Sequence, residues 1–223
     1  MESGWIDISV PIFTGMAYWP DNPPVQMRRM MDMDRGDDCT VSVLSIGSHT
    51  GTHMDAPSHF IRTGLAMDQM PLDAGVGPAR VIAIDDPDSI RLEEIRPCAI
   101  RRSERILFKT RNSGRRWEKE PFHKKFVYLS TEAAVFLARR QIRLVGVDYL
   151  SVGGYEKNGL EVHRALLGGG VWIVEGLNLS EADSGRYHLI CLPLRMQGAD
   201  GAPARAVLRR LASSKSGRKG KRK

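Results

Sequence analysis

One short stretch of the sequence holds most of the side chains that could bind a metal ion. Imidazole nitrogens and carboxylate oxygens are the usual ligands of zinc, and they also suit manganese or iron. Gly51 and Pro57 argue against a continuous helix in this stretch. Positions that differ by even numbers share one face of an extended chain, so the spacing predicts a metal site on extended backbone. The residues concerned are His49, His53, Asp55 and His59.

A solvated surface histidine is the alternative for any one of these residues taken alone. A metal ion bound only by this stretch would keep open coordination positions and would be bound only moderately tightly. A later residue is therefore expected to complete its set of ligands. Glu175 follows a predicted strand at 171–174, and His163 lies at the start of a predicted helix at 162–167. Both are candidates, although a strand-end glutamate or a helix histidine is often solvated and without a role.

The elements that must position these side chains alternate between strands and helices. Residues 126–148 are typical of a β-α-β unit, with Ser130 or Thr131 capping the helix, and this unit predicts a parallel strand pair with a helix on one face. A second such unit ends at Glu175. We therefore expect one α/β domain. The predicted strands are 5–10, 40–46, 79–85, 105–110, 126–130, 143–148, 171–174, 187–194 and 206–209, and the predicted helices are 90–95, 132–140 and 162–167.

Three further segments carry separate expectations. Trp19 stands beside Pro20 in a loop, where it either packs simply or forms one wall of a pocket for a flat substrate. The basic segment 111–125 is expected to be an exposed loop with a solvated His123. Residues 25–33 weakly indicate a strand, and its methionines are expected to fill the core. These are Met27, Met30, Met31 and Met33.

Composition bounds the class of protein. The chain has 223 residues, of which 42% are hydrophobic and 26% charged, as in an ordinary globular protein. We expect one domain over residues 1–211 and a basic, disordered tail over 212–223. The tail holds six of the positive charges behind the net charge of +7, so the rest is nearly neutral and a nucleic-acid partner is not expected.

The cysteines and the hydropathy of the chain indicate the cellular compartment of the protein. The three cysteines are widely spaced and form no C-x-x-C pair, so neither a disulfide framework nor a thiolate metal site is indicated. No apolar run approaches the length that spans a membrane, and the first residues lack the pattern of a signal peptide. The prediction is a cytoplasmic protein without a membrane partner.

The stretch from His49 to Phe60 resembles the H-x-G-T-H-x-D-x-P-x-H-F signature of the cyclase family, which includes bacterial-type kynurenine formamidases and isatin hydrolases. The resemblance runs from about Trp5 to about Arg209. It implies a swivelling β/β/α fold with a mixed sheet, and a homo-oligomer that is commonly a dimer. It also implies a small aromatic substrate that contacts Trp19.

The resemblance further assigns roles residue by residue. One metal would be bound by His49, His53, Asp55 and Glu175, and a second by Asp55, His163 and Glu175. The family's metals imply Zn²⁺, one or two ions per chain, with Mn²⁺ as the alternative. His59 would be the catalytic residue that donates and accepts the proton.

The implied activity is that of an arylformamidase in tryptophan catabolism, a metal-dependent hydrolase that cleaves an amide bond by means of a metal-bound hydroxide. N-formyl-kynurenine is the first substrate to test. A hydrolase of a cyclic amide or lactone, such as isatin, is the alternative, and a non-catalytic binder of a ligand or polyanion is another. The turn at 151–154 and the basic segment 111–125 depart from many relatives, so the substrate stays open.

Overall fold

The molecule is built around a mixed β-sheet that closes into a barrel. The structure, a computed structural model, describes residues 4–211. Seven strands follow one another in the order β12, β11, β5, β7, β9, β10 and β4, and a second pairing joins β4 back to β12. The sheet contains β1 (Trp5–Asp7), β4 (His53–Asp55), β5 (Val76–Ala83), β7 (Arg105–Lys109), β9 (Leu144–Val147), β10 (Trp172–Glu175), β11 (Gly185–Pro193) and β12 (Gly201–Arg210).

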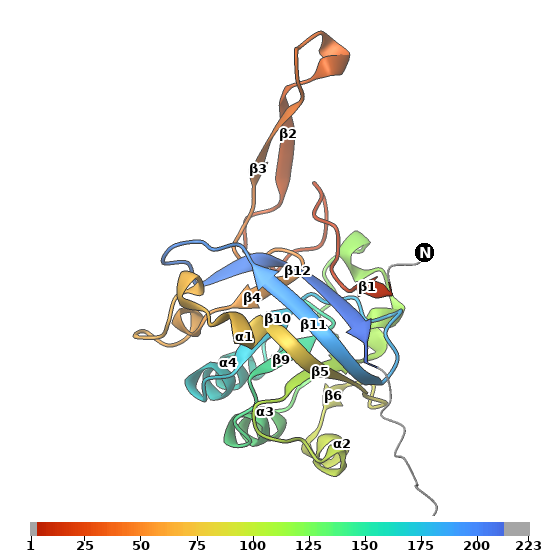
Figure 1. Ribbon diagram of the computed structural model, residues 1–223, viewed down its shortest axis with the longest axis vertical. Helices are drawn as coiled ribbons and strands as arrows, with labels where there is room; N and C mark the ends of the chain where they lie inside the picture. Colours follow the sequence, from red (N-terminus) through yellow and green to blue (C-terminus); the bar gives the residue numbers. More distant parts are fainter. Residues whose placement is uncertain (1–3, 212–223) are drawn as a thin grey trace, which may run out of the picture.

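Strand directions divide the barrel into two parts. β5, β7, β9 and β10 run parallel to one another, whereas β4, β11 and β12 pair antiparallel with their neighbours. Helices lie on one side of the parallel part (Figure 1). The predicted class, a single-domain α/β fold with a mixed sheet, is confirmed. The predicted tail, 212–223, lies outside the described residues.

Short helices and two small sheets complete the chain. The helices are α1 (Leu72–Gly75), α2 (Leu92–Ile95), α3 (Thr131–Arg139) and α4 (Gly159–Gly168), and the 3-10 turns are η1 (Met33–Arg35), η2 (Pro57–His59), η3 (Met67–Gln69), η4 (Arg96–Cys98), η5 (Arg111–Gly114) and η6 (Trp117–Lys119). The small sheets pair β2 (Gln26–Met31) with β3 (Val41–Ser45), and β6 (Ser89–Ile90) with β8 (Tyr128–Leu129). None of the helices between residues 4 and 211 has the length and apolar character needed to cross a membrane.

The alternation of side chains along β7 separates two cores. Leu107 packs inside the barrel with Leu144 of β9, whereas Ile106 and Phe108 pack on the outside against the helices, where Leu137 of α3 lies. Ser130 caps α3 as predicted, since its hydroxyl accepts a hydrogen bond from the Ala133 N–H. Both faces of β7, β9 and β10 are therefore buried, which fixes their register and the position of the loops at their ends.

The first predicted β-α-β unit is wrong in its strand pairing. β8, the strand before α3, pairs with β6 in a separate sheet, while β9, the strand after α3, pairs with β7 and β10. β7 and β10 already occupy both edges of β9, so β8 has no place beside it. The second unit is as predicted, because α4 connects the parallel neighbours β9 and β10. The helix starts at Gly159, so His163 lies in its middle and not at its start.

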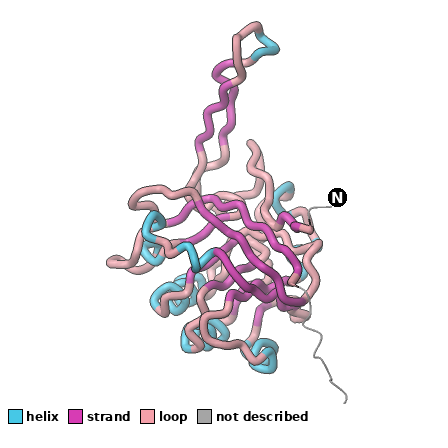
Figure 2. The backbone as a smooth tube through the Cα atoms, viewed as in Figure 1, coloured by secondary structure: helices cyan, strands magenta, loops and turns pink. Residues whose placement is uncertain are grey.

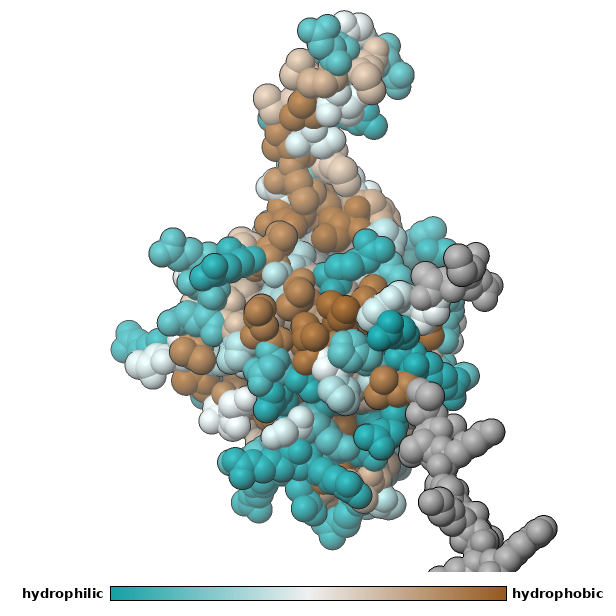
Figure 3. Space-filling view, in the orientation of Figure 1, coloured by the Kyte–Doolittle hydropathy of each residue, from teal (hydrophilic) through white to brown (hydrophobic). Residues whose placement is uncertain are grey.

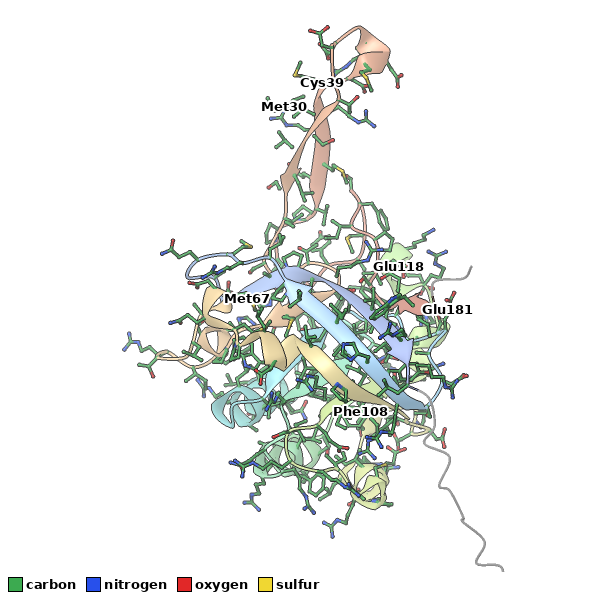
Figure 4. The ribbon with its side chains drawn as sticks, in the orientation of Figure 1. Met30, Cys39, Met67, Phe108, Glu118 and Glu181 are labelled. Atoms are coloured by element: carbon green, nitrogen blue, oxygen red, sulfur yellow. The ribbon has the colours of Figure 1, made fainter. Side chains whose placement is uncertain are left out.

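The methionines of residues 25–33 do not fill the core. β2 and β3 form a two-stranded arm that projects away from the barrel (Figures 1 and 2), and every residue of β2 is exposed. Met30 is 56% exposed, and Figure 4 shows it on the arm together with Cys39. The local pattern indicated an apolar strand correctly, but burial depends on a partner that the pattern cannot report.

The basic segment 111–125 is only partly the exposed loop that was expected. It contains η5 and η6, and the side chains of Trp117 and Glu118 are buried. Asp148, at the end of β9, accepts hydrogen bonds from the backbone and hydroxyl groups of Thr110 and Ser113, which folds the segment onto the barrel. Burial nevertheless raises the pKa of Asp148. His123 is exposed, as predicted.

Candidate metal centre

The barrel strand β4 and its neighbour β10 bring the first part of the site together. His53 of β4 lies directly opposite Glu175 of β10 in the antiparallel register. His53 and Asp55 point to one face of β4, while Met54 between them points into the barrel core. All three residues of β4 are buried. A three-residue strand with partners on both sides thus holds two of the predicted site residues rigidly.

Asp55 lies at the middle of the histidines. One of its oxygens, Oδ1, is 3.0 Å from His49 Nδ1 and 3.5 Å from His53 Nε2. The other, Oδ2, is 3.6 Å from His163 Nε2. Glu175 lies on the far side, with Oε2 3.3 Å from His53 Nε2 and Oε1 3.2 Å from His163 Nε2. Three histidines therefore converge on two carboxylates that are more than a hundred residues apart in sequence.

Two atoms of this cluster indicate a site for a cation. His53 Nε2 and Asp55 Oδ2 are buried, and neither has a hydrogen-bond partner within the described part of the chain. Buried polar atoms without partners are rare, and each requires a reason such as a bound ion. Sets of three side chains whose ligand atoms lie within 4.8 Å of one another are His49, Asp55 and His59, and His53, Asp55 and Glu175. The residues fit a divalent metal ion.

The second ring nitrogen of each of three histidines is held by an acceptor outside the cluster. His53 Nδ1 is 2.9 Å from the Gly51 carbonyl oxygen, and His163 Nδ1 is 2.6 Å from the Gly159 carbonyl oxygen. His49 Nε2 is 3.0 Å from a carboxylate oxygen of Asp200. Such contacts fix the ring orientation and leave the other nitrogen directed at the centre.

His59 differs from these three histidines. It lies in η2, and its ring takes part in no hydrogen bond with any described residue. Its ring stacks on that of His49, with 4.0 Å between centroids, and its Nδ1 is 3.6 Å from Asp200. Burial, together with the charges of His49 and His163, holds the pKa of His59 below its ordinary value. This imidazole is therefore neutral at pH 7.

The carboxylates raise the pKa of two neighbouring histidines and so favour their charged forms. Burial opposes the charged form of His49, but hydrogen bonds to Asp200 and Asp55 outweigh it and raise its pKa to about 10. Burial also opposes the charged form of His163, yet its hydrogen bond to Glu175 raises its pKa. Despite burial, the histidines hold the pKa of Asp55 well below its usual range. Without a cation, the centre thus retains protons.

The predicted extended face is correct only for part of the stretch. β4 is three residues long, Gly51 adopts a φ of +60° before it, and η2 follows it. A strand that alternates over eleven residues is therefore absent, since the chain bends on either side of β4. The histidines still meet because these bends return His49 and His59 toward Asp55.

A cavity of about 580 Å³ opens beside the centre. Trp19 lines it, and the ring of Trp19 packs edge-on against Phe122 at 5.1 Å and near Tyr155 at 5.5 Å. No lysine or arginine is among the described residues that line the cavity. Its lining includes Trp19, Phe60, Leu150, Leu160, His49, His59, His163, Glu175 and Asp200.

Asp200 is a residue of the site that the sequence does not reveal. It lies in the connection between β11 and β12, immediately before Gly201. The structure explains why glycine follows it, because a Cβ on Gly201 would lie 2.6 Å from His49 Cε1 and only glycine allows this approach. Nothing in the local pattern, however, connects this turn with a histidine about 150 positions earlier.

Comparisons with known proteins agree with this geometry. The cyclase family model, described as "Putative cyclase", matches residues 6–153. The chain is 34% identical to a kynurenine formamidase of Bacillus cytotoxicus over 94% of this chain and 99% of the relative, and 36% identical to one of Bacillus cereus over 93% and 98%.

Solved structures show the same similarity. A protein described as a "potential metal-dependent hydrolase with cyclase activity" superposes with a TM-score of 0.81 at 34% identity, covering 93% of this chain and 98% of that one. Isatin hydrolase A of Labrenzia aggregata, bound to benzyl benzoate, superposes with a TM-score of 0.78 at 25% identity, with 92% of each chain covered. The chain belongs to the cyclase family.

Proposed function

We propose that this protein is a metal-dependent hydrolase that cleaves an amide bond, with an arylformamide such as N-formyl-kynurenine as its substrate. The observation that carries the proposal is a buried centre in which three histidines converge on two carboxylates beside an aromatic cavity. The kynurenine formamidases of 34–36% identity support the same activity.

In this proposal, one cation would be held by His49, His53, Asp55 and Glu175, and a second by Asp55, His163 and Glu175. The three histidines lie 3.0–3.6 Å from Asp55, so these side chains are close enough to act as one set of ligands. Zn²⁺ is the expected metal and Mn²⁺ the alternative, because the donors are nitrogen and oxygen without thiolate. A cation bound here would lower the pKa of a water molecule and polarise the amide carbonyl.

His59 is the proposed proton donor and acceptor. Its ring lines the cavity and is free of hydrogen bonds to other described side chains, so both nitrogens are available to water and substrate. Because its pKa is lowered, the neutral ring can take a proton from the attacking water and return it to the leaving nitrogen. Trp19 would hold the aromatic ring of the substrate edge-on or stacked.

Metal analysis combined with two variants tests the proposal. The wild type should hold stoichiometric metal and hydrolyse an arylformamide. Asp55→Ala should lose both, with hydrolysis reduced by about 10³-fold or more, since several kcal/mol of charge stabilisation disappear. His59→Ala should keep its metal but lose about 10²- to 10⁴-fold in kcat. A wild type without stoichiometric metal, or hydrolysis that survives both substitutions, would contradict the proposal.

A cyclic amide or lactone is the second candidate substrate. The similarity to an isatin hydrolase and a cavity lined without lysine or arginine favour a neutral ring. A panel of arylformamides, isatins and lactones separates the candidates by kcat/KM. A non-catalytic polyanion binder is the remaining rival. Deleting residues 212–223 should leave hydrolysis unchanged, whereas a wild type that binds polyanions and hydrolyses no member of the panel would favour that rival.

We also propose a homo-oligomer, a dimer or higher, in the cytoplasm. The free thiols of Cys39, Cys98 and Cys191 support this compartment. The arm, β2 and β3, carries apolar side chains that no other described element covers, and Figure 3 shows hydrophobic surface along it. A second apolar surface lies on the body around α1 and the end of β11. Its exposed members are Leu72, Leu192, Leu194 and Met196.

Two apolar surfaces on one chain can cover each other in a symmetric pair of copies, which is the commonest closed arrangement. Met27 of β2 and Leu44 of β3 are cross-strand partners on the arm. Leu44→Asp should therefore lower the oligomer mass measured by light scattering to that of a monomer. Ser45→Asp adds the same charge at an exposed arm position on the other face of β3 and should leave the mass unchanged. A Leu44→Asp variant that keeps the mass of the wild type would refute a role for the arm.

A further inference from the structure

The inference concerns Asp200, which lies immediately before β12 and faces the cavity. Its backbone carbonyl accepts a hydrogen bond from the Ala56 N–H at 2.9 Å, and the next residue, Gly201, is paired with Asp55 in the β12–β4 register. The contact between β12 and β4 is the one that closes the barrel. The position of Asp200 is therefore tied to the same strand that holds Asp55.

We propose that Asp200 is a positioning residue that sets the ring orientation and tautomer of His49 for metal binding. This inference rests on the proposed metal centre. Its first support is the pair of contacts made by the carboxylate: Oδ2 lies 3.0 Å from His49 Nε2, and Oδ1 accepts a hydrogen bond from the Ser48 hydroxyl at 3.1 Å.

The second support is the contrast between His49 and the other two histidines of the centre. His53 and His163 are oriented by carbonyl groups only two and four residues away, so their own local backbone sets the rings. His49 lies in the bend between β3 and β4, and among the described residues outside the centre its ring has a hydrogen-bond partner only in Asp200, 151 positions later. It is also the most exposed of the three. Its orientation therefore depends on Asp200.

The third support is the chemistry of the contact. An ionised carboxylate can only accept hydrogen bonds, so the nitrogen that faces it, Nε2, must carry the hydrogen. The other nitrogen, Nδ1, faces Asp55, which is itself a proposed metal ligand. When a cation replaces the hydrogen on Nδ1, the hydrogen on Nε2 stays with Asp200, so the ring binds through Nδ1. Gly201 leaves the space that the His49 ring needs, since a Cβ at this position would lie 2.6 Å from Cε1 of the ring. The Asp200–Gly201 segment thus binds the ring by a hydrogen bond and leaves room for it.

A consequence follows for His59. Its ring stacks on that of His49, and its Nδ1 is 3.6 Å from Asp200, beyond hydrogen-bond distance. Asp200 therefore acts on His59 through the position of His49 and through its charge. Loss of the carboxylate should weaken metal binding first, and hydrolysis should fall in proportion to the metal that is lost.

The decisive experiment measures zinc affinity by competition with a chromophoric chelator in the wild type, Asp200→Asn and Asp200→Ala. Both variants should bind Zn²⁺ about 10- to 100-fold more weakly, as is typical when the outer partner of a histidine ligand is removed. Asp183→Asn is the matched control, because Asp183 is an exposed carboxylate whose long contact with Arg210 lies away from the cavity. It should bind as the wild type does.

A second measurement reports on the ring itself. The ¹⁵N chemical shifts of His49 in the zinc-loaded wild type should show hydrogen on Nε2 and metal on Nδ1. Unchanged zinc affinity in Asp200→Asn, or hydrogen on Nδ1, would overturn the inference. Zinc binding without amide hydrolysis in the wild type would refute only the proposed function, whereas a wild type that binds no metal would refute both.

Discussion

Strand β4 and the arm formed by β2 and β3 are opposite extremes of β-structure in one chain. β4 has three residues, all buried, with a partner strand on each side. β2 has six residues, all exposed, and within residues 4–211 β2 and β3 pair only with each other. β4 holds His53 and Asp55 in place because buried neighbours surround it on all sides. The arm has few such contacts.

The first comparison between the two regions concerns the loss of stability and metal binding when a glycine with positive φ is replaced. Gly176 follows β10 with a φ of +68°, and a Cβ there would lie 2.1 Å from the Gly51 carbonyl oxygen, which accepts the hydrogen bond from His53. Gly176→Ala should cost about 3 kcal/mol or more and disrupt metal binding. Gly36, at the tip of the arm, has a φ of +93° with open space around it, so Gly36→Ala should cost about 1 kcal/mol. Chemical unfolding and metal content check both variants, and equal losses would contradict the contrast.

Two methionines provide a second comparison, in which only the free energy of unfolding is measured. Met54 of β4 is fully buried in the barrel core, whereas Met30 is more than half exposed. Met54→Ala should lower the free energy of unfolding by about 2–5 kcal/mol, because it leaves a cavity. Met30→Ala should change it by no more than about 0.5 kcal/mol in the dissociated chain. Measurements at low protein concentration are required, since association would stabilise the arm. A large loss for Met30 under those conditions would mean that the arm packs on its own barrel.

The same contrast explains what the sequence could and could not predict. The stretch from His49 to His59 was found because its ligand types and spacing are local, and the strands around it were found because alternation and β-branched residues are local too. The burial of the arm methionines was predicted wrongly, because alternation reports an apolar face and not the presence of a partner.

Pairings between residues far apart in the sequence could not be predicted either. The place of β8 beside β6 depends on the competition of several strands for the edges of β9. The contact of Asp200 with His49 depends on the closure of the barrel by β12 and β4. Glu175 and His163 could be proposed as partners from the resemblance, whereas spacing alone left them open. Barrel closure is a property of the whole sheet, so no window of sequence contains it.

The last comparison is the response to pH, in which the metal centre should titrate and the arm should not. In the metal-free protein, the pKa of His49 is raised to about 10, so its proton must leave before a cation can bind. A raised pKa also means that this group stabilises the metal-free fold below about pH 6.5, the ordinary pKa of histidine, and that this stabilisation is lost as the pH rises toward 10. Zinc affinity should therefore increase by about tenfold for each pH unit between 7 and 9, or about 1.4 kcal/mol per unit.

The raised pKa of His163 acts in the same direction and can only make this slope steeper. Association through the arm should be constant over the same range, because methionine and leucine side chains do not titrate. Zinc competition and light scattering on the same samples from pH 7 to 9 provide both curves. A flat zinc curve would mean that His49 holds no proton in the metal-free centre, and an association that follows the zinc curve would mean that the arm and the centre are coupled and not independent.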